Sequence, residues 1–172
     1  MPPTSLQLQS VIDAFGQQGW HCDQVEGREV VRTAFEAHHT NLDLIAQAFP
    51  QLNALAVVAE APMAFDSPRQ PLALELINRA NKQLTLGSFE FDLDRELLVF
   101  RITKIFDREK FDRDIISCMV HCAIAEVDRF TPLAAVLNQT AEDLLPDLSI
   151  PLLLEREDHL PPVPEFGEEE ER

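Results

Sequence analysis

The fold class is decided by residues 89–103, which read FEFDLDRELLVFRIT. Residues 89–93 alternate apolar and acidic side chains, as a strand with one face in water does. Residues 97–103 are rich in β-branched and aromatic side chains, and both faces of this second strand carry apolar groups. The acidic and basic residues 94–96 suit a tight connection. The stretch therefore predicts a β-hairpin, with Phe89, Phe91 and Leu93 on one face of its first strand.

The residues before the hairpin predict one helix and several strands. Ser5 is expected to cap a helix over about residues 5–18, in which Leu8, Val11, Ile12 and Phe15 recur at helical spacing. We expect strands at 22–25, 29–37, 42–49 and 54–61. The run 42–49 also fits a helical stripe, and we interpret it as a strand because it is only eight residues long before Pro50.

Two more helices are expected, one on each side of the hairpin. The first follows Pro68 and Pro71, and its apolar face is formed by Ala73, Leu76, Ile77, Ala80 and Leu84. The second runs from about Lys110 to Asn138, with Pro132 bending or breaking it. The order α-β-β-β(β)-α-β-β-α predicts an α+β fold, an antiparallel sheet with helices mainly on one side.

The composition restricts the possible partners. Thirty acidic and fourteen basic residues give a net charge of -16 over 172 residues. This field repels nucleic acid phosphates and anionic lipid headgroups, so we expect neither nucleic acid nor a membrane as a partner. Residues 1–5 lack the features of a secretory signal, and the three cysteines are an odd number. These features predict a cytoplasmic location.

A boundary near residue 140 predicts a domain over 1–140 and an acidic, proline-rich extension over 141–172. The extension contains eleven acidic and two basic residues, and five of the twelve prolines. Its segment 148–154 (LSIPLLL) is apolar but interrupted by proline, so we expect an extended strap that packs on the domain or on a dimer mate. Residues 161–172 cannot bury enough apolar surface to offset their ordering entropy, which predicts a mobile end.

Three short blocks, together with the long closing helix, resemble a known family. They are residues 76–82 (LINRANK), 87–92 (GSFEFD) and 99–101 (VFR). In this arrangement the sequence resembles the bacterial YbjN-like family and its cyanobacterial relatives, which share the fold of type III secretion chaperones. The resemblance covers residues 5 to about 140. It implies an antiparallel sheet with helices mostly on one side, often a homodimer, and no catalytic residues.

The polar residues inside this signature are Asn78 and Asn81. An asparagine at a helix end commonly satisfies nearby backbone groups, and the functional alternative is a hydrogen bond to a bound peptide. The predicted partner-binding residues are these two asparagines and four hairpin residues: Asn78, Asn81, Phe89, Phe91, Leu97 and Val99.

Some of the histidines and cysteines are candidates for a metal or nucleophile site. Cys118, His121 and Cys122 occupy helical positions i, i+3 and i+4, and the pair His21-Cys22 could supply further zinc ligands. The surrounding helix is apolar, however, and thiols in such helices pack as small hydrophobic groups. A Cys-His nucleophile also needs an electropositive setting, which this acidic and apolar sequence lacks.

The sequence contains none of the common phosphate-binding, dinucleotide, metalloprotease or hydrolase motifs. We therefore predict no cofactor and no metal. The function that we expect is a non-enzymatic module, homodimeric and adaptor-like or chaperone-like, that binds a protein or peptide partner. The alternative hypothesis is a small-ligand or metal-dependent enzyme that uses the His and Cys groups.

Overall fold

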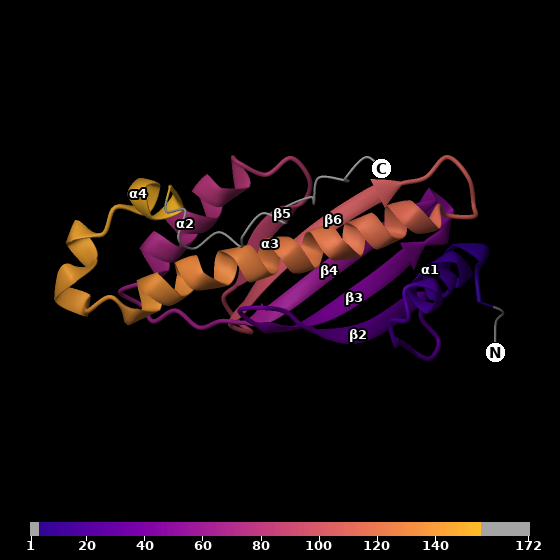
Figure 1. The fold of residues 1–172 in the computed structure, drawn as a ribbon, viewed down its shortest axis with the longest axis horizontal. Helices are drawn as coiled ribbons and strands as arrows, with labels where there is room; N and C mark the ends of the chain where they lie inside the picture. Colours follow the sequence, from indigo (N-terminus) through magenta and orange to yellow (C-terminus); the bar gives the residue numbers. More distant parts are fainter. Residues whose placement is uncertain (1–3, 156–172) are drawn as a thin grey trace, which may run out of the picture.

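The computed structural model describes residues 4–155 and contains a six-stranded sheet whose neighbouring strands are all antiparallel (Figure 1). The elements are α1 (Leu6–Gln17), β1 (Asp23–Gln24), β2 (Val30–Glu36), β3 (Asn41–Phe49), β4 (Ala54–Pro62), α2 (Gln70–Asn81), β5 (Ser88–Asp92), β6 (Leu97–Ile105), α3 (Arg113–Gln139) and α4 (Ile150–Leu154), with 3-10 helices η1 (Pro50–Leu52) and η2 (Glu142–Asp147). The strand order in space is β1-β2-β3-β4-β6-β5. The predicted α+β class is confirmed, and residues 42–49 form a strand as expected.

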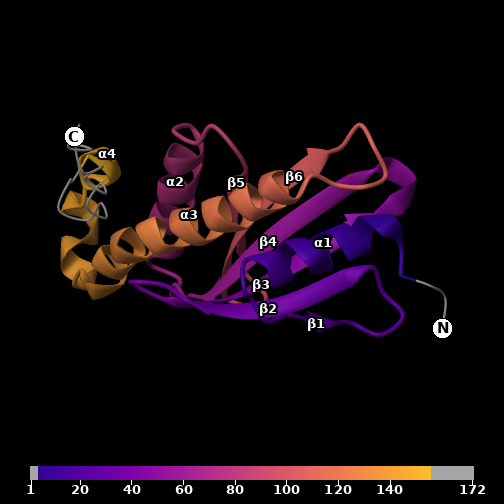
Figure 2. The same ribbon diagram turned by 45° about the vertical axis from the view of Figure 1, so that its right-hand side comes forward.

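One face of the sheet is covered by helices. α1 and α3 lie across it, and β3 alternates buried residues toward them with exposed ones away from them (Figure 2). The helix side contributes fully buried residues such as Phe15, Leu44 and Phe100 to a single core cluster. Ser5 caps α1 as predicted, since its hydroxyl accepts the N–H of Leu8 at 3.0 Å.

The other face of the sheet is not covered by any helix of the described chain. Its middle carries small apolar side chains, of which Val58 and Val99 are buried among their neighbours. Arg95 forms an ion pair with Glu60 across this face at 3.1 Å, and the hydrogen bond with Glu60 raises the pKa of Arg95. Long charged side chains therefore lie over part of the apolar surface.

The turn of the hairpin begins one residue earlier than predicted. β5 ends at Asp92, whose carboxylate accepts the backbone N–H groups of Asp94 and Arg95 at 3.1 and 3.0 Å. This Asx-type turn takes Leu93 out of the strand and leaves it 52% exposed. The prediction that Leu93 shares a face with Phe89 and Phe91 is therefore wrong.

α3 continues through Pro132 to Gln139, close to the predicted end at Asn138, so of the two effects expected of this proline, bending or breaking, breaking does not occur. The proline removes one backbone hydrogen bond, but buried residues lie on both sides of it, among them Phe130, Leu133 and Leu137. Their packing against the sheet and α2 stabilises the helix across the missing bond.

The segment 148–154 contains α4, so the prediction that it is extended is wrong. Pro151 lies in the first turn of α4, where its backbone nitrogen has no intrahelical acceptor to lose, and Ser149 caps the helix. α4 lies beside α2 (Figure 1) and buries Ile150 and Leu153 in the main core cluster. The predicted mobile end, 161–172, lies outside the described residues.

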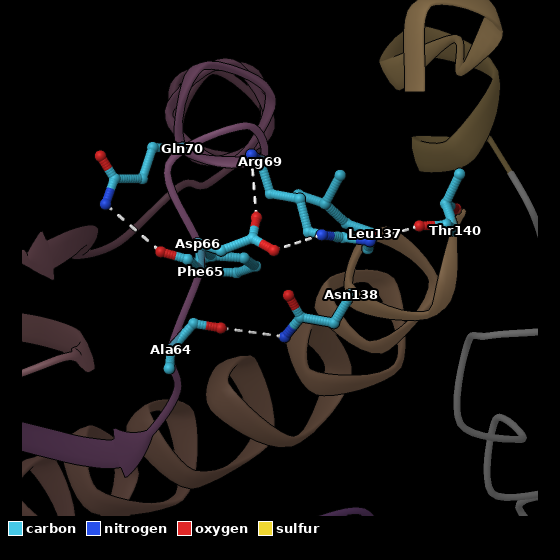
Figure 3. A network of polar contacts seen from close by, with 8 residues as sticks. All are labelled: Ala64, Phe65, Asp66, Arg69, Gln70, Leu137, Asn138 and Thr140. Atoms are coloured by element: carbon cyan, nitrogen blue, oxygen red, sulfur yellow. Dashed lines mark hydrogen bonds and ion pairs between the residues drawn. The ribbon is translucent and has the colours of Figure 1, made fainter. Parts of the chain in front are cut away.

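Arg69, which precedes α2, holds the end of α3 in place (Figure 3). Its guanidinium donates to the backbone carbonyls of Leu137 at 3.2 Å and Thr140 at 2.6 Å, and it is paired with Asp66. Nearby, the side chain of Asn138 donates to the carbonyl of Ala64 at 3.1 Å. A cation on the last carbonyls of a helix satisfies them and complements the helix dipole, so this network fixes where the extension leaves the domain.

Candidate functional site

Both polar atoms of the Asn81 side chain form hydrogen bonds within the domain. Its amide oxygen accepts the N–H of Phe89 at 2.7 Å, and its amide nitrogen donates to the carbonyl of Phe89 at 3.0 Å. The two bonds join the end of α2 to β5, as the structural interpretation of a helix-end asparagine predicts. Asn78, one turn earlier, is exposed on α2.

The six predicted partner-binding residues do not share one surface. Phe89 is 3% exposed against Phe100 and Phe130, and Phe91 packs edge-on against Phe65. These aromatic rings lie on the helix side of the sheet, whereas Leu97 and Val99 lie on the opposite face. The six residues therefore do not form a single contiguous site.

The second half of β6 has an open edge, because no strand of the described chain pairs with it on the β5 side. The pairing between β5 and β6 stops at Ser88, the first residue of β5, which lies opposite Arg101, while β6 continues to Ile105. The N–H of Phe106 donates to the carbonyl of Asn53, the residue before β4. Because the peptide groups of successive strand residues point to alternate sides, the even-numbered residues of β6 turn theirs toward β4. The peptide groups of Thr103 and Ile105 therefore face the side where no strand of the described chain continues.

An apolar groove of about 360 Å³ runs beside this open edge. We call it the β6 edge groove, and its lining consists of Leu86, Ile102, Thr103, Lys104, Asp114, Ile115, Cys118 and Met119. The first turns of α3 form one wall and β6 forms the other. Leu86 and Ile115 are 58% and 38% exposed, and Ile105 at the end of the strand is 70% exposed. The groove thus combines unpaired peptide groups with exposed apolar side chains.

A polar hollow of about 860 Å³ lies next to the groove, around the loop between β6 and α3, and shares the lining residues Lys104, Asp114 and Ile115 with it. The basic residues of the hollow are Lys104, Arg108, Lys110 and Arg113, and its acidic residues are Asp107, Asp112 and Asp114. Arg113 is paired with Asp13 at 2.8 Å, and Asp112 caps α3 by accepting two backbone N–H groups. Lys104, Arg108 and Lys110 form no ion pair within residues 4–155, so this end of an acidic protein presents free cations.

The histidines and cysteines do not converge on a metal site in the part of the chain that the structure describes, where no cluster of three His, Cys, Asp or Glu could hold an ion. Cys118 is exposed in the β6 edge groove, while Cys22 and Cys122 are half-buried. Burial raises the pKa of both half-buried thiols, and nearby Asp23 and Glu126 add to the rise. Their reactive thiolate form is therefore disfavoured.

No helix among residues 4–155 is long and apolar enough to cross a membrane. Residues 7–134, from α1 into the second half of α3, match the family model "YbjN: Putative bacterial sensory transduction regulator". The chain belongs to the YbjN family. The resemblance seen in residues 76–101 is thereby confirmed. The YbjN match ends before η2 and α4, so the extension lies beyond it.

Two solved structures are similar to this chain. The crystal structure of YbjN from E. coli, described as a putative transcription regulator, has 12% identity and a TM-score of 0.53, over 70% of this chain and 84% of that one. The HopA1-SchA chaperone-effector complex has 12% identity and a TM-score of 0.48, over 71% and 89% of the two chains. No curated protein matches the sequence. The first similarity supports the fold of the YbjN family.

Proposed function

We propose that this YbjN-family protein is a non-enzymatic adaptor that holds an extended protein segment in the β6 edge groove. The observation that carries the proposal is the coincidence of an open strand edge at Thr103 and Ile105 with an apolar groove beside it. An added strand would take its hydrogen bonds from the edge and place alternate side chains in the groove. The family description as a regulator of sensory transduction fits a protein that acts through its contacts.

The polar hollow defines the chemistry of the partner. A segment that leaves the groove toward Arg108 and Lys110 meets free cations, so acidic residues next to the apolar ones are favoured. The expected partner is an extended segment with apolar side chains at alternate positions, followed by Asp or Glu. The alternative, a His/Cys enzyme, gains no metal-binding cluster from the described residues.

Peptide display against the full-length protein tests this proposal. The selected peptides are then measured as synthetic probes against Thr103→Pro, which removes an edge N–H, and Ile115→Lys, which places a charge in the groove. We expect each substitution to weaken binding about tenfold or more, because each removes an interaction worth more than about 1.4 kcal/mol. Leu74→Lys, at an exposed leucine of α2, is the matched control and is expected to change nothing. Equal affinity for all four proteins would contradict the proposal.

The proposal includes a homodimer and a cytoplasmic location. The sheet face opposite the helices carries Ile45, Val58 and Val99 between its charged groups, and a second copy is the partner that we expect on it. Light scattering at physiological salt is expected to give about twice the chain mass of 19.5 kDa. A mass of one chain at micromolar concentration would contradict the dimer but not the groove.

A further inference from the structure

We infer that the chain's own residues 156–172 dock in the β6 edge groove and compete with partner segments. This inference rests on the proposed function, because it assigns an intramolecular occupant to the same groove. Three observations carry it: the chemistry of the segment, the free cations beside the groove, and the length of chain that follows Glu155.

The segment combines apolar residues with a following acidic run, as the groove and hollow require. Its large apolar residues, Leu160, Val163 and Phe166, are spaced three apart rather than at alternate positions, and four consecutive glutamates, 168–171, follow them. The prolines at 161, 162 and 164 disfavour a helix and favour an extended backbone. In the polyproline II form of an extended backbone, residues three apart lie on one side, and apolar grooves bind this form through those side chains. Phe166 therefore suits the groove, and the glutamates suit the hollow.

Charge favours a tethered segment over a free one. Residues 156–172 carry seven acidic and two basic residues. Lys104, Arg108 and Lys110 form no ion pair within residues 4–155, so they are available to the acidic residues of the segment, although Asp107 and Asp114 line the same hollow. A separate acidic peptide would pair with the same cations, but the protein's net charge of -16 slows its approach at long range. A segment of the same chain is supplied at a high effective concentration, which offsets this repulsion.

The length of the chain is sufficient. From Cys118 to the end of α3 at Gln139, a helix rising 1.5 Å per residue spans about 32 Å. Eleven residues lead from Glu155 to Phe166, and an extended chain of this length spans about 36 Å at 3.3 Å per residue. α4 and the end of α3 both contact the region of α2, so the segment starts beside the far end of α3.

Cys118 provides a probe for the test, because its exposed thiol lines the groove. The rate at which a neutral maleimide modifies Cys118 is measured by peptide mapping in the full-length protein. If the segment occupies the groove for about two-thirds of the time, Phe166→Ala raises this rate about threefold, and replacing glutamates 168–171 with glutamine has a similar effect. A synthetic peptide of residues 156–172 restores the slow rate of Phe166→Ala.

The matched control is Leu152→Ala, at an exposed leucine of α4 outside the groove, which leaves the rate unchanged. Equal rates in the parent protein, Phe166→Ala and the glutamine variant overturn the inference. Protection of Cys118 that rises with protein concentration also overturns it and assigns the groove to a second copy. Neither outcome tests the proposed function, which fails only if the selected peptides bind Thr103→Pro and Ile115→Lys with the same affinity as the parent protein.

Discussion

The side chain of Asn81 forms two hydrogen bonds with the backbone of one residue, Phe89, and so ties the last turn of α2 to β5. β5 is an edge strand of five residues that pairs only with β6 in the described sheet. The asparagine therefore stands in for part of the pairing that a second neighbouring strand would give. It also keeps the strand in register where the groove begins.

Asn81→Ala is expected to lower the free energy of unfolding by about 1–3 kcal/mol, because it leaves the N–H and C=O of Phe89 without their partners. Asn78→Ala, on the exposed side of the same helix, is the control and is expected to stay within about 0.5 kcal/mol of the parent protein. Urea unfolding of the two variants measures the difference. Equal effects would show that the two bonds contribute no net stability.

Gly87→Ala is expected to destabilise the protein more than Gly27→Ala. Both glycines have a positive φ, +72° and +71°, so both substitutions strain the backbone by about 1 kcal/mol or more. At Gly87 the added Cβ would also lie 2.5 Å from the Phe100 ring and 2.8 Å from the Arg101 carbonyl, while at Gly27 it meets nothing within 4 Å. Thermal unfolding should show an additional loss of about 1–3 kcal/mol at Gly87, the usual cost of overpacking. Identical midpoints would mean that β6 shifts to accommodate the methyl group.

Ile150→Ala is expected to cost about 2–5 kcal/mol, because the side chain is 1% exposed in the core cluster and its removal leaves a cavity. Leu152→Ala, two residues later and 66% exposed, should cost less than about 0.5 kcal/mol. A single unfolding transition in both variants is the expected result, since α4 belongs to the same core as the sheet. If the first variant instead unfolds in two steps, the extension is a separate cooperative unit.

Stability at alkaline pH is expected to depend on Cys22 and Cys122. Burial raises the pKa of both thiols in the folded protein, so above pH 9 the unfolded chain loses protons that the folded chain retains. The stability that the two raised pKa values contribute is fully present below the pKa of the thiols in the unfolded chain. It is lost as the pH rises through their pKa in the folded protein. The double variant Cys22→Ala/Cys122→Ala should therefore lose less stability between pH 8 and 10 than the parent protein. A parallel pH dependence of the two proteins would contradict this assignment.

The sequence predicted the sheet well because its strands alternate clearly and their turns carry recognisable residues. Residues 42–49 were ambiguous by periodicity, and the nearby Pro50 resolved them correctly as a strand. At Pro132 the sequence left bending and breaking open, and at Pro151 it wrongly predicted an extended segment, because the effect of a proline depends on tertiary packing and on its position within the helix turn. Both outcomes follow from information that local patterns do not contain.

The candidate groove could not be predicted from the sequence. Its residues come from the loop at Leu86, the end of β6 and the first turns of α3, and only the sheet register places them together. A weak signal exists in the unequal length of the hairpin strands, since the predicted second strand was already longer than the first. Asn81 stands out in the sequence as a polar residue at the end of an apolar helix, but only the structure shows that its partner is the backbone of Phe89.

The strand order also determines what can form while the chain is still being synthesised. β2, β3 and β4 each pair with the preceding strand, so residues 23–62 close through short loops. The pairing of β4 with β6 is the one non-sequential contact of the described sheet, and it joins residues such as Ala56 and Thr103. A nascent chain that has not reached residue 97 therefore exposes the edge of β4 with its apolar side chains, which makes this interval of translation the period of greatest risk for misassembly.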